Sequence, residues 1–330
     1  MSTQATPTPD HDEQDANQTL SRASFTETDS RKDEMHDTIE DWIQDLIDAT
    51  EEARSNEEFQ EWLTVQSKFH DYSYRNTVLI KLQKPDATQV AGYHTWKNDF
   101  DRYVQKGESG IWIWAPIITK KCPDCGTAPS YHNSIDCDYE DTDPDSWERG
   151  LVGFKPTTVF DISQTEGEPL PEPDISAETH GDGTELVDAF LNAGELLELD
   201  VTVVPEDDWA YEGKKGVCKG RSIYDLYPII EVVDRENKAD LVRTLAHEYA
   251  HAKLHFGVDD RGEKRKREVE AESVAYAVAR HFGLDPENSG FYLASWADDE
   301  EDILRERLQR ISSTIQTIIE AIETAGNRAE

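Results

Sequence analysis

One stretch, LVRTLAHEYAHAKLHF at residues 241–256, constrains the fold more than any other part of the chain. Its apolar residues recur at helical spacing, which predicts a helix with one buried face. His247 and His251 lie four residues apart, so both imidazoles project from one face and can reach one metal ion. Glu248 is then placed to take a proton from a metal-bound water. The pattern is typical of the active-site helix of zinc peptidases.

The next predicted helix, residues 266–281, offers a third ligand. Glu268 and Glu272 lie four residues apart on one face of it, so Glu268 can bind the metal while Glu272 orients a ligand histidine. Glu270 points away from both. The sequence therefore predicts one catalytic zinc held by His247, His251 and Glu268. The alternative is that the histidines are ordinary packing or surface residues and the glutamates a solvated face.

These motifs carry a resemblance to known families. The HExxH sequence followed by Glu268-x-x-Ala-Glu272 resembles the ImmA/IrrE-type metallopeptidases, a compact gluzincin group, over residues 184–330. Residues 72–116 and 159–171 resemble the ArdC-type antirestriction proteins, which join a single-stranded-DNA-binding domain to a zinc peptidase domain. The resemblance implies an α+β protein of two domains. The C-terminal domain would be gluzincin-like, with a small sheet and the HExxH helix.

The domain organisation expected from these patterns has four parts. Residues 1–34 are polar and acidic and predict a disordered tail. An ArdC-like N-terminal domain covers 35–165, with a cysteine-rich insertion at 120–147, and a Glu- and Pro-rich linker covers 166–183. The zinc peptidase domain covers 184–330. A strand expected at 227–233, directly before the HExxH helix, is a candidate to bind substrate along its edge.

Composition restricts the setting. Seventy acidic residues against 33 basic ones give a formal charge of −37, which by itself argues against binding nucleic acid. We interpret the charge as a halophilic adaptation, because in molar salt the Debye length falls to about 3 Å and surface carboxylates repel one another little. The sequence shows neither an N-terminal apolar run nor a stretch long enough to span a membrane. The expected location is cytoplasmic.

Residues 68–121 differ from the rest of the chain, with nine Lys or Arg residues against five acids. Aromatic residues are interleaved with these cations, a pattern that favours stacking of single-stranded DNA bases. The alternative is that most of the aromatic residues belong to the core. The candidate contact residues are Tyr74, Arg75, Tyr93, Trp96, Lys97 and Lys106.

Three of the four cysteines fall in a short segment with the spacing Cys-x2-Cys-x6-His-x4-Cys. Cys122, Cys125, His132 and Cys137 predict a possible second, structural zinc site in a reducing compartment. A metal-free acidic hairpin is the alternative.

The function that these features predict is a zinc-dependent endopeptidase coupled to a module that binds single-stranded DNA, in an antirestriction, mobile-element or regulatory setting. Glu248 would be the general base and a protein or peptide the substrate. The alternative is a non-catalytic protein that occludes DNA and carries a structural zinc site. Tyr211, Tyr224 and His255 are the candidates to stabilise an oxyanion, and the sequence indicates no oligomeric state.

Overall fold

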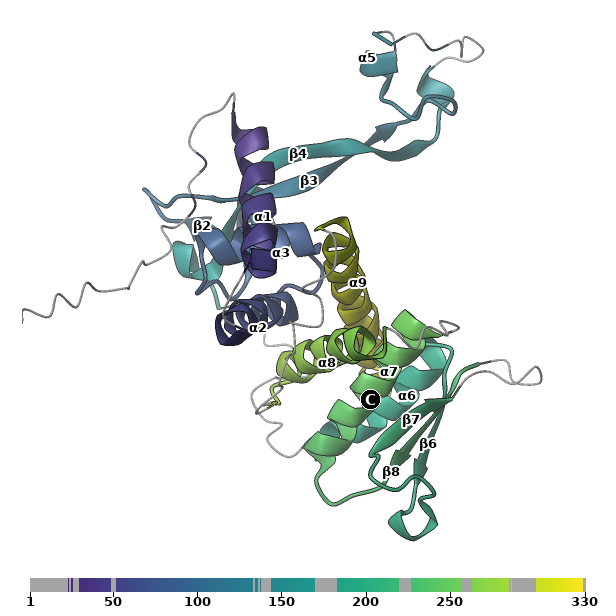
Figure 1. Ribbon diagram of the computed structural model, residues 1–330. Coiled ribbons are helices and arrows are strands. Elements are labelled where there is room, and N and C mark those ends of the chain that lie inside the picture. The colour runs from purple at the N-terminus through teal and green to yellow at the C-terminus, as the bar shows by residue number, and fades with distance from the viewer. Residues whose placement is uncertain are drawn as a thin grey trace, which may run out of the picture.

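The chain forms a mixed α and β protein, which confirms the α+β class; the gluzincin fold itself stays a prediction (Figure 1). The computed structural model describes residues 23, 25, 30–48, 52–132, 134–135, 137, 144–169, 183–219, 227–256, 263–284, 286 and 301–328. The predicted linker lies largely outside the described residues. No helix in this described part is long and apolar enough to cross a membrane.

The N-terminal half combines helices with two small antiparallel sheets. One sheet has the order β1-β4-β3, and the other pairs β2 with β5. β3 and β4 form a long hairpin whose register runs from Ile111 opposite Val159 to Lys120 opposite Arg149. The hairpin projects away from the helices (Figure 1). The elements are α1 (Arg31–Asp48), α2 (Glu52–Lys68), α3 (Tyr74–Gln83), β1 (Val90–Gly92), α4 (Tyr93–Asn98), β2 (Arg102–Val104), β3 (Ile111–Lys120), α5 (Pro129–His132), β4 (Arg149–Asp161) and β5 (Thr165–Gly167).

The C-terminal half places a three-stranded sheet beside α6, α7, α8 and α9. The strand order is β6-β8-β7, with β8 parallel to β6 and antiparallel to β7. The prediction that the strand expected at 227–233 binds substrate along its edge is therefore wrong. This strand is β8, which has β6 on one side and β7 on the other. Among the described strands, β6 and β7 form the two edges of this sheet. The elements are α6 (Val187–Leu196), β6 (Asp200–Val204), β7 (Gly216–Lys219), β8 (Ile229–Val233), α7 (Lys238–His255), α8 (Lys264–His281) and α9 (Glu301–Gly326).

The hydrophobic core joins the two halves. Trp62 on α2 belongs to the same buried cluster as Val274 on α8 and Ile315 on α9, and all three side chains are fully buried. A second, smaller cluster lies between α2, α3 and the β1-β4-β3 sheet. The expected N-terminal and C-terminal domains thus share a core among the described residues. Their boundaries stay a prediction.

The disordered tail predicted to end at residue 34 is wrong at its C-terminal end, because Phe25 and residues 30–34 are among the described residues. Phe25 is only 4% exposed and packs into the main core, and α1 already begins at Arg31. A single buried aromatic ring anchors this stretch although its average composition is polar. Most of residues 1–29 lie outside the described part of the chain.

A buried carboxylate connects the three helices around the core. Glu270 on α8 is fully buried and lies 2.6 Å from Nε2 of His255 on α7. It also accepts hydrogen bonds from Arg307 at 2.9 Å and Arg310 at 2.5 Å, both on α9. The cations and the imidazole lower the pKa of Glu270 although burial opposes this. The negative charge of Glu270 is therefore balanced by groups on both α7 and α9.

We expect the substitution Glu270→Gln to lower the free energy of unfolding by about 3 kcal/mol, because it removes the buried charge that His255, Arg307 and Arg310 share, although Arg307 retains its contact with Glu263. Urea-induced unfolding of the metal-free protein measures this change. Glu320→Gln on the exposed face of α9 is the matched control and should change stability by less than about 0.5 kcal/mol. Equal effects of the two substitutions would show that the buried carboxylate does not hold these helices together.

Candidate metal centre

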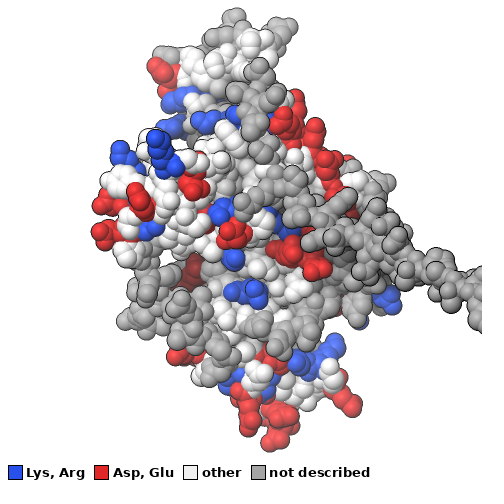
Figure 2. Space-filling view, turned by 90° about the vertical axis from the view of Figure 1, so that its left-hand side faces the viewer, with Lys and Arg blue, Asp and Glu red and all other residues white. Residues whose placement is uncertain are grey.

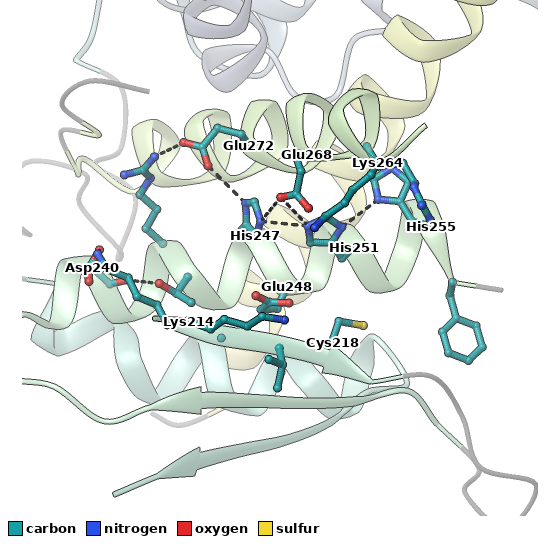
Figure 3. Close-up of a pocket in the computed structure, with 17 residues that line it drawn as sticks. Lys214, Cys218, Asp240, His247, Glu248, His251, His255, Lys264, Glu268 and Glu272 are labelled. Carbon is teal, nitrogen blue, oxygen red and sulfur yellow. Dashed lines mark hydrogen bonds and ion pairs between the residues drawn. The ribbon is translucent and has the colours of Figure 1, made fainter. Parts of the chain in front are cut away.

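Three side chains from α7 and α8 converge on one point (Figure 3). Nε2 of His247 and Nε2 of His251 lie 3.0 Å apart, and Glu268 Oε2 lies 3.6 Å from the first and 3.5 Å from the second. A tetrahedral ion with bonds of about 2.0–2.2 Å separates its ligand atoms by about 3.3–3.5 Å. The observed triangle therefore fits a metal ion.

The local sequence fixes where α7 begins and how closely α8 packs against it. Asn237 caps α7 by accepting a hydrogen bond from the Asp240 backbone N–H at 3.0 Å. Alanines on both helices are fully buried in the shared core, and their small side chains permit close packing. The buried alanines are Ala246 and Ala250 on α7 and Ala271, Ala275 and Ala277 on α8.

The second nitrogen of each histidine also has a partner. His247 Nδ1 lies 3.3 Å from Glu272 Oε2, and Arg243 donates to the other oxygen of Glu272. His251 Nδ1 lies 3.1 Å from Nδ1 of His255, which in turn contacts Glu270 through Nε2. Glu272 thus takes the orienting position predicted for it, on His247.

The contact with Glu270 sets the tautomers along this chain. A neutral His255 donates its Nε2–H to the carboxylate, so its Nδ1 carries a lone pair and accepts the Nδ1–H of His251. In the form that binds a metal, His251 would then direct a lone pair on Nε2 at the point where Glu268 and His247 meet. Burial lowers the pKa of His255 and favours this neutral form despite the nearby carboxylate. Sequence reasoning missed this arrangement, although the spacing of four residues from His251 to His255 was a signal for it.

Glu248 stands beside the triangle and does not belong to it. It is 7% exposed and lines a pocket of about 730 Å³ together with the three candidate ligands. In Figure 3 it lies on the side of α7 that faces β7. Gly216 of β7 makes room for it, since a Cβ there would lie 2.8 Å from Glu248 Oε1. Burial raises the pKa of Glu248, and the attraction of His247 opposes the shift.

Electrostatics within the triangle are strong when no metal is bound. Burial alone would lower the pKa of His247, but the contacts with Glu268 and Glu272 outweigh it and raise the pKa to about 9. The two imidazoles hold the pKa of Glu268 far below its usual range. The metal-free centre is therefore an ion pair, with a proton where the metal would bind.

The oxyanion candidates fall in different places. Tyr211 packs edge-on against Trp209, with ring centroids 5.1 Å apart, and is not among the residues that line the pocket. His255 lines the pocket, but both of its ring nitrogens already have partners. Tyr224 lies outside the described residues.

The candidate nucleic-acid contacts divide into core and surface residues. Trp96 is 2% exposed and donates its Nε1–H to the Phe160 carbonyl at 2.7 Å, and Tyr74 is 3% exposed. Neither ring can stack on a base, because the core already covers both. Tyr93 remains 47% exposed and Arg75 is half-buried. Lys97 and Lys106 are exposed, as are two rings that were not singled out, Phe100 and Tyr103.

The predicted second metal group is also brought together. Cys122, Cys125, His132 and Cys137 meet at the end of the β3–β4 hairpin, and their donor atoms all lie within 4.8 Å of one another. The four residues of this group lie in the connection between β3 and β4, whereas the first centre lies on α7 and α8.

Comparisons with known proteins agree in part with the family resemblance of the sequence. No family model matches the chain. An uncharacterized protein of Bacillus anthracis is 28% identical over 302 residues, which cover 84% of this chain and 50% of that protein. The chain thus spans about half the length of this relative.

Two crystal structures of the antirestriction protein ArdC from plasmid R388 are structural neighbours. The metal-free structure has a TM-score of 0.42 and 18% identity, covering 77% of this chain and 85% of ArdC. The Mn(II)-bound structure has a TM-score of 0.48 and 16% identity, covering 90% of this chain and 99% of ArdC. ArdC belongs to the resemblance stated above, whereas neither structure is described as an ImmA/IrrE peptidase or as holding zinc.

We expect Glu268→Ala to abolish tight metal binding at this centre, and Glu272→Ala to weaken it about 10–100-fold by freeing the His247 ring. Titration of the metal-free protein with Mn(II), which prefers oxygen and nitrogen donors to thiolates, reports on this centre. If the Glu268 variant binds Mn(II) as tightly as the wild type, Glu268 is not the third ligand.

Metal binding should release a proton near neutral pH. A ligand histidine must be neutral, whereas the pKa of His247 is about 9 in the metal-free protein, above its usual 6.5. The metal affinity should therefore rise with pH, by up to about tenfold per unit below pH 9, and level off above it. Calorimetry in buffers of different ionisation enthalpy counts the protons. An affinity that is constant between pH 7 and pH 8.5 would contradict the assignment.

Proposed function

We propose that the chain is a metal-dependent hydrolase that cleaves peptide bonds. The position of Glu248 is the observation that supports this most directly. A structural site has four protein ligands and no need for a neighbouring base, whereas here a buried carboxylate lies beside a triangle of three candidate ligands. The pocket leaves space for a substrate next to it.

The roles of the residues follow from their positions. His247, His251 and Glu268 would hold a divalent metal, which supplies Lewis-acid chemistry and makes a water molecule more acidic when bound. Glu248 would take the proton from that water and pass it to the leaving amine. The raised pKa of Glu248 suits both steps, since a stronger base accepts the proton more readily and can still release it. Glu272 and His255 hold the two imidazoles in place.

The sheet edge beside the pocket supports a polypeptide substrate. Gly216, Val217 and Cys218 of β7 line the pocket, and β7 pairs with β8 on one side only among the described strands. An extended peptide can add to such an edge through backbone hydrogen bonds. This arrangement would place the peptide backbone next to Glu248.

A second candidate is a protein that binds single-stranded DNA without cleaving anything. Tyr93 and Phe100 on or beside α4 and Tyr103 on β2 are exposed, and α4 packs against β2. Lys97 and Lys106 add positive charge nearby. Neither of the two matched proteins is named as a peptidase, and ArdC is named for antirestriction. In this candidate the metal centre would have a structural role.

The substitution Glu248→Gln separates the two candidates. It keeps the volume of the side chain and leaves the three candidate ligands in place, but it removes the base. We expect metal binding to persist while hydrolysis of a denatured protein substrate falls by about two to four orders of magnitude. Glu236→Gln, on the exposed turn before α7, is the matched control and should keep full activity. If neither the wild type nor the control cleaves protein while both bind DNA, the binding candidate is the correct one.

We expect the full chain to bind single-stranded DNA more tightly than duplex, with Tyr93→Ala weakening binding by about 1–3 kcal/mol through loss of stacking. Basic and acidic side chains are interleaved on the face in Figure 2, so stacking should contribute more than charge and part of the affinity should survive molar salt. Fluorescence anisotropy of labelled oligonucleotides measures this. Tyr227→Ala, which also removes an exposed tyrosine, is the control. Equal affinity for duplex would contradict the stacking surface.

A further inference from the structure

The end of the β3–β4 hairpin plays no part in the reaction proposed above. Residues 121–148 connect the two strands far from the shared core (Figure 1). Among the described residues of this segment, only Cys122 and Trp147 are buried. A small unit with so little apolar burial needs cross-links to keep one structure. The side chains that meet here indicate what the cross-link is.

The donor atoms already have nearly the spacing of a zinc site. A tetrahedral zinc ion separates two thiolate sulfurs by about 3.8 Å, and a sulfur from an imidazole nitrogen by about 3.5 Å. Cys125 Sγ lies 3.5 Å from His132 Nδ1, and all four donors lie within 4.8 Å of one another. Small side-chain movements are enough to close this group around one ion.

The backbone of the hairpin end positions these side chains in advance. The Gly126 N–H donates to the Cys122 carbonyl at 3.0 Å, and the Cys122 N–H donates to the Thr127 carbonyl at 2.9 Å. This tight turn requires Gly126 at φ +72°, a conformation that favours glycine. It brings the first two cysteines together from neighbouring positions in the chain.

His132 is held by a residue that lies just before β4. It ends α5, and its ring packs edge-on against the buried Trp147 with centroids 5.1 Å apart. The packing keeps Nδ1 directed at Cys125. The histidine is thus oriented by a residue that precedes β4, so the metal group ties both ends of the connection together.

A disulfide explains the group less well than a metal. All three thiols are free in the structure, and any one disulfide would use only two of them and would not include the histidine. Cys137 Sγ also lies 3.7 Å from an Asp124 carboxylate oxygen, and Cys125 Sγ lies 3.1 Å from the Thr127 hydroxyl. One metal ion satisfies all four donors at once.

We infer that Cys122, Cys125, His132 and Cys137 bind a structural zinc ion, distinct from the candidate centre on α7 and α8. Thiolates favour zinc over harder cations, and four protein ligands leave no open position for a substrate. The fourth cysteine, Cys218, lies in β7 on the pocket and takes no part. The inference does not depend on the proposed hydrolysis.

The experiment uses the full chain purified under reducing conditions. Elemental analysis should find two metal equivalents in the wild type, one in Glu268→Ala and one in Cys125→Ser, while Cys218→Ser, the matched control, keeps both. After replacement by Co(II), a thiolate-to-metal charge-transfer absorption should appear in the wild type, Glu268→Ala and Cys218→Ser. It should be absent in Cys125→Ser and reduced in Cys137→Ser.

Two results would overturn the inference. One is a Glu268→Ala protein with no zinc and no thiolate–Co(II) absorption. The other is a disulfide among the three cysteines in the reduced protein. Thiol reactivity of the wild type provides a check that needs no variant: a strong chelator should make three further thiols reactive, and an unchanged number would also overturn the site. The inference and the proposed reaction can fail independently. The metal content and thiol measurements test the hairpin zinc, whereas the activity of Glu248→Gln tests the proposed reaction.

Discussion

The buried carboxylate of Glu270 is the interaction on which the arrangement of the C-terminal helices depends. A fully buried ion is tolerated only when its charge is compensated, and here α7 provides His255 while α9 provides Arg307 and Arg310. Apolar packing alone would permit the helices to slide or rotate. The ionic contacts require one relative position, because a small shift would leave a charge without a partner in the core.

This constraint extends to the candidate metal centre. Glu270 fixes the tautomer of His255, His255 accepts from His251, and His251 is left with its lone pair directed at the point where Glu268 and His247 meet. Glu272, two residues further along α8 and held by Arg243, orients His247 in the same way. The histidines of the centre are therefore oriented by contacts that reach the core of the protein, while Glu268 stands at its exposed side. A loop could not hold three donors within 3.6 Å of one another so firmly.

Local spacing predicted more of the centre than of its surroundings. Histidines four residues apart must share a helix face, and the same rule placed Glu268 and Glu272 together. The connection from Glu270 to α9 crosses 37 residues to Arg307, so no local pattern could reveal it. Composition also could not separate the buried Trp96 from the exposed Tyr93 three residues earlier. Likewise, the shared core of α2 and α8 arises from contacts between distant segments.

The position of Gly216 connects the sheet to the proposed chemistry. A side chain at this position would press on Glu248, since its Cβ would approach the carboxylate oxygen to 2.8 Å. The edge strand and the proposed base are therefore in direct contact, and a peptide that pairs with β7 would lie against both. Substrate binding and placement of the base would then depend on the same short strand. Of the strands in this sheet, β7 lines the pocket and the central β8 does not.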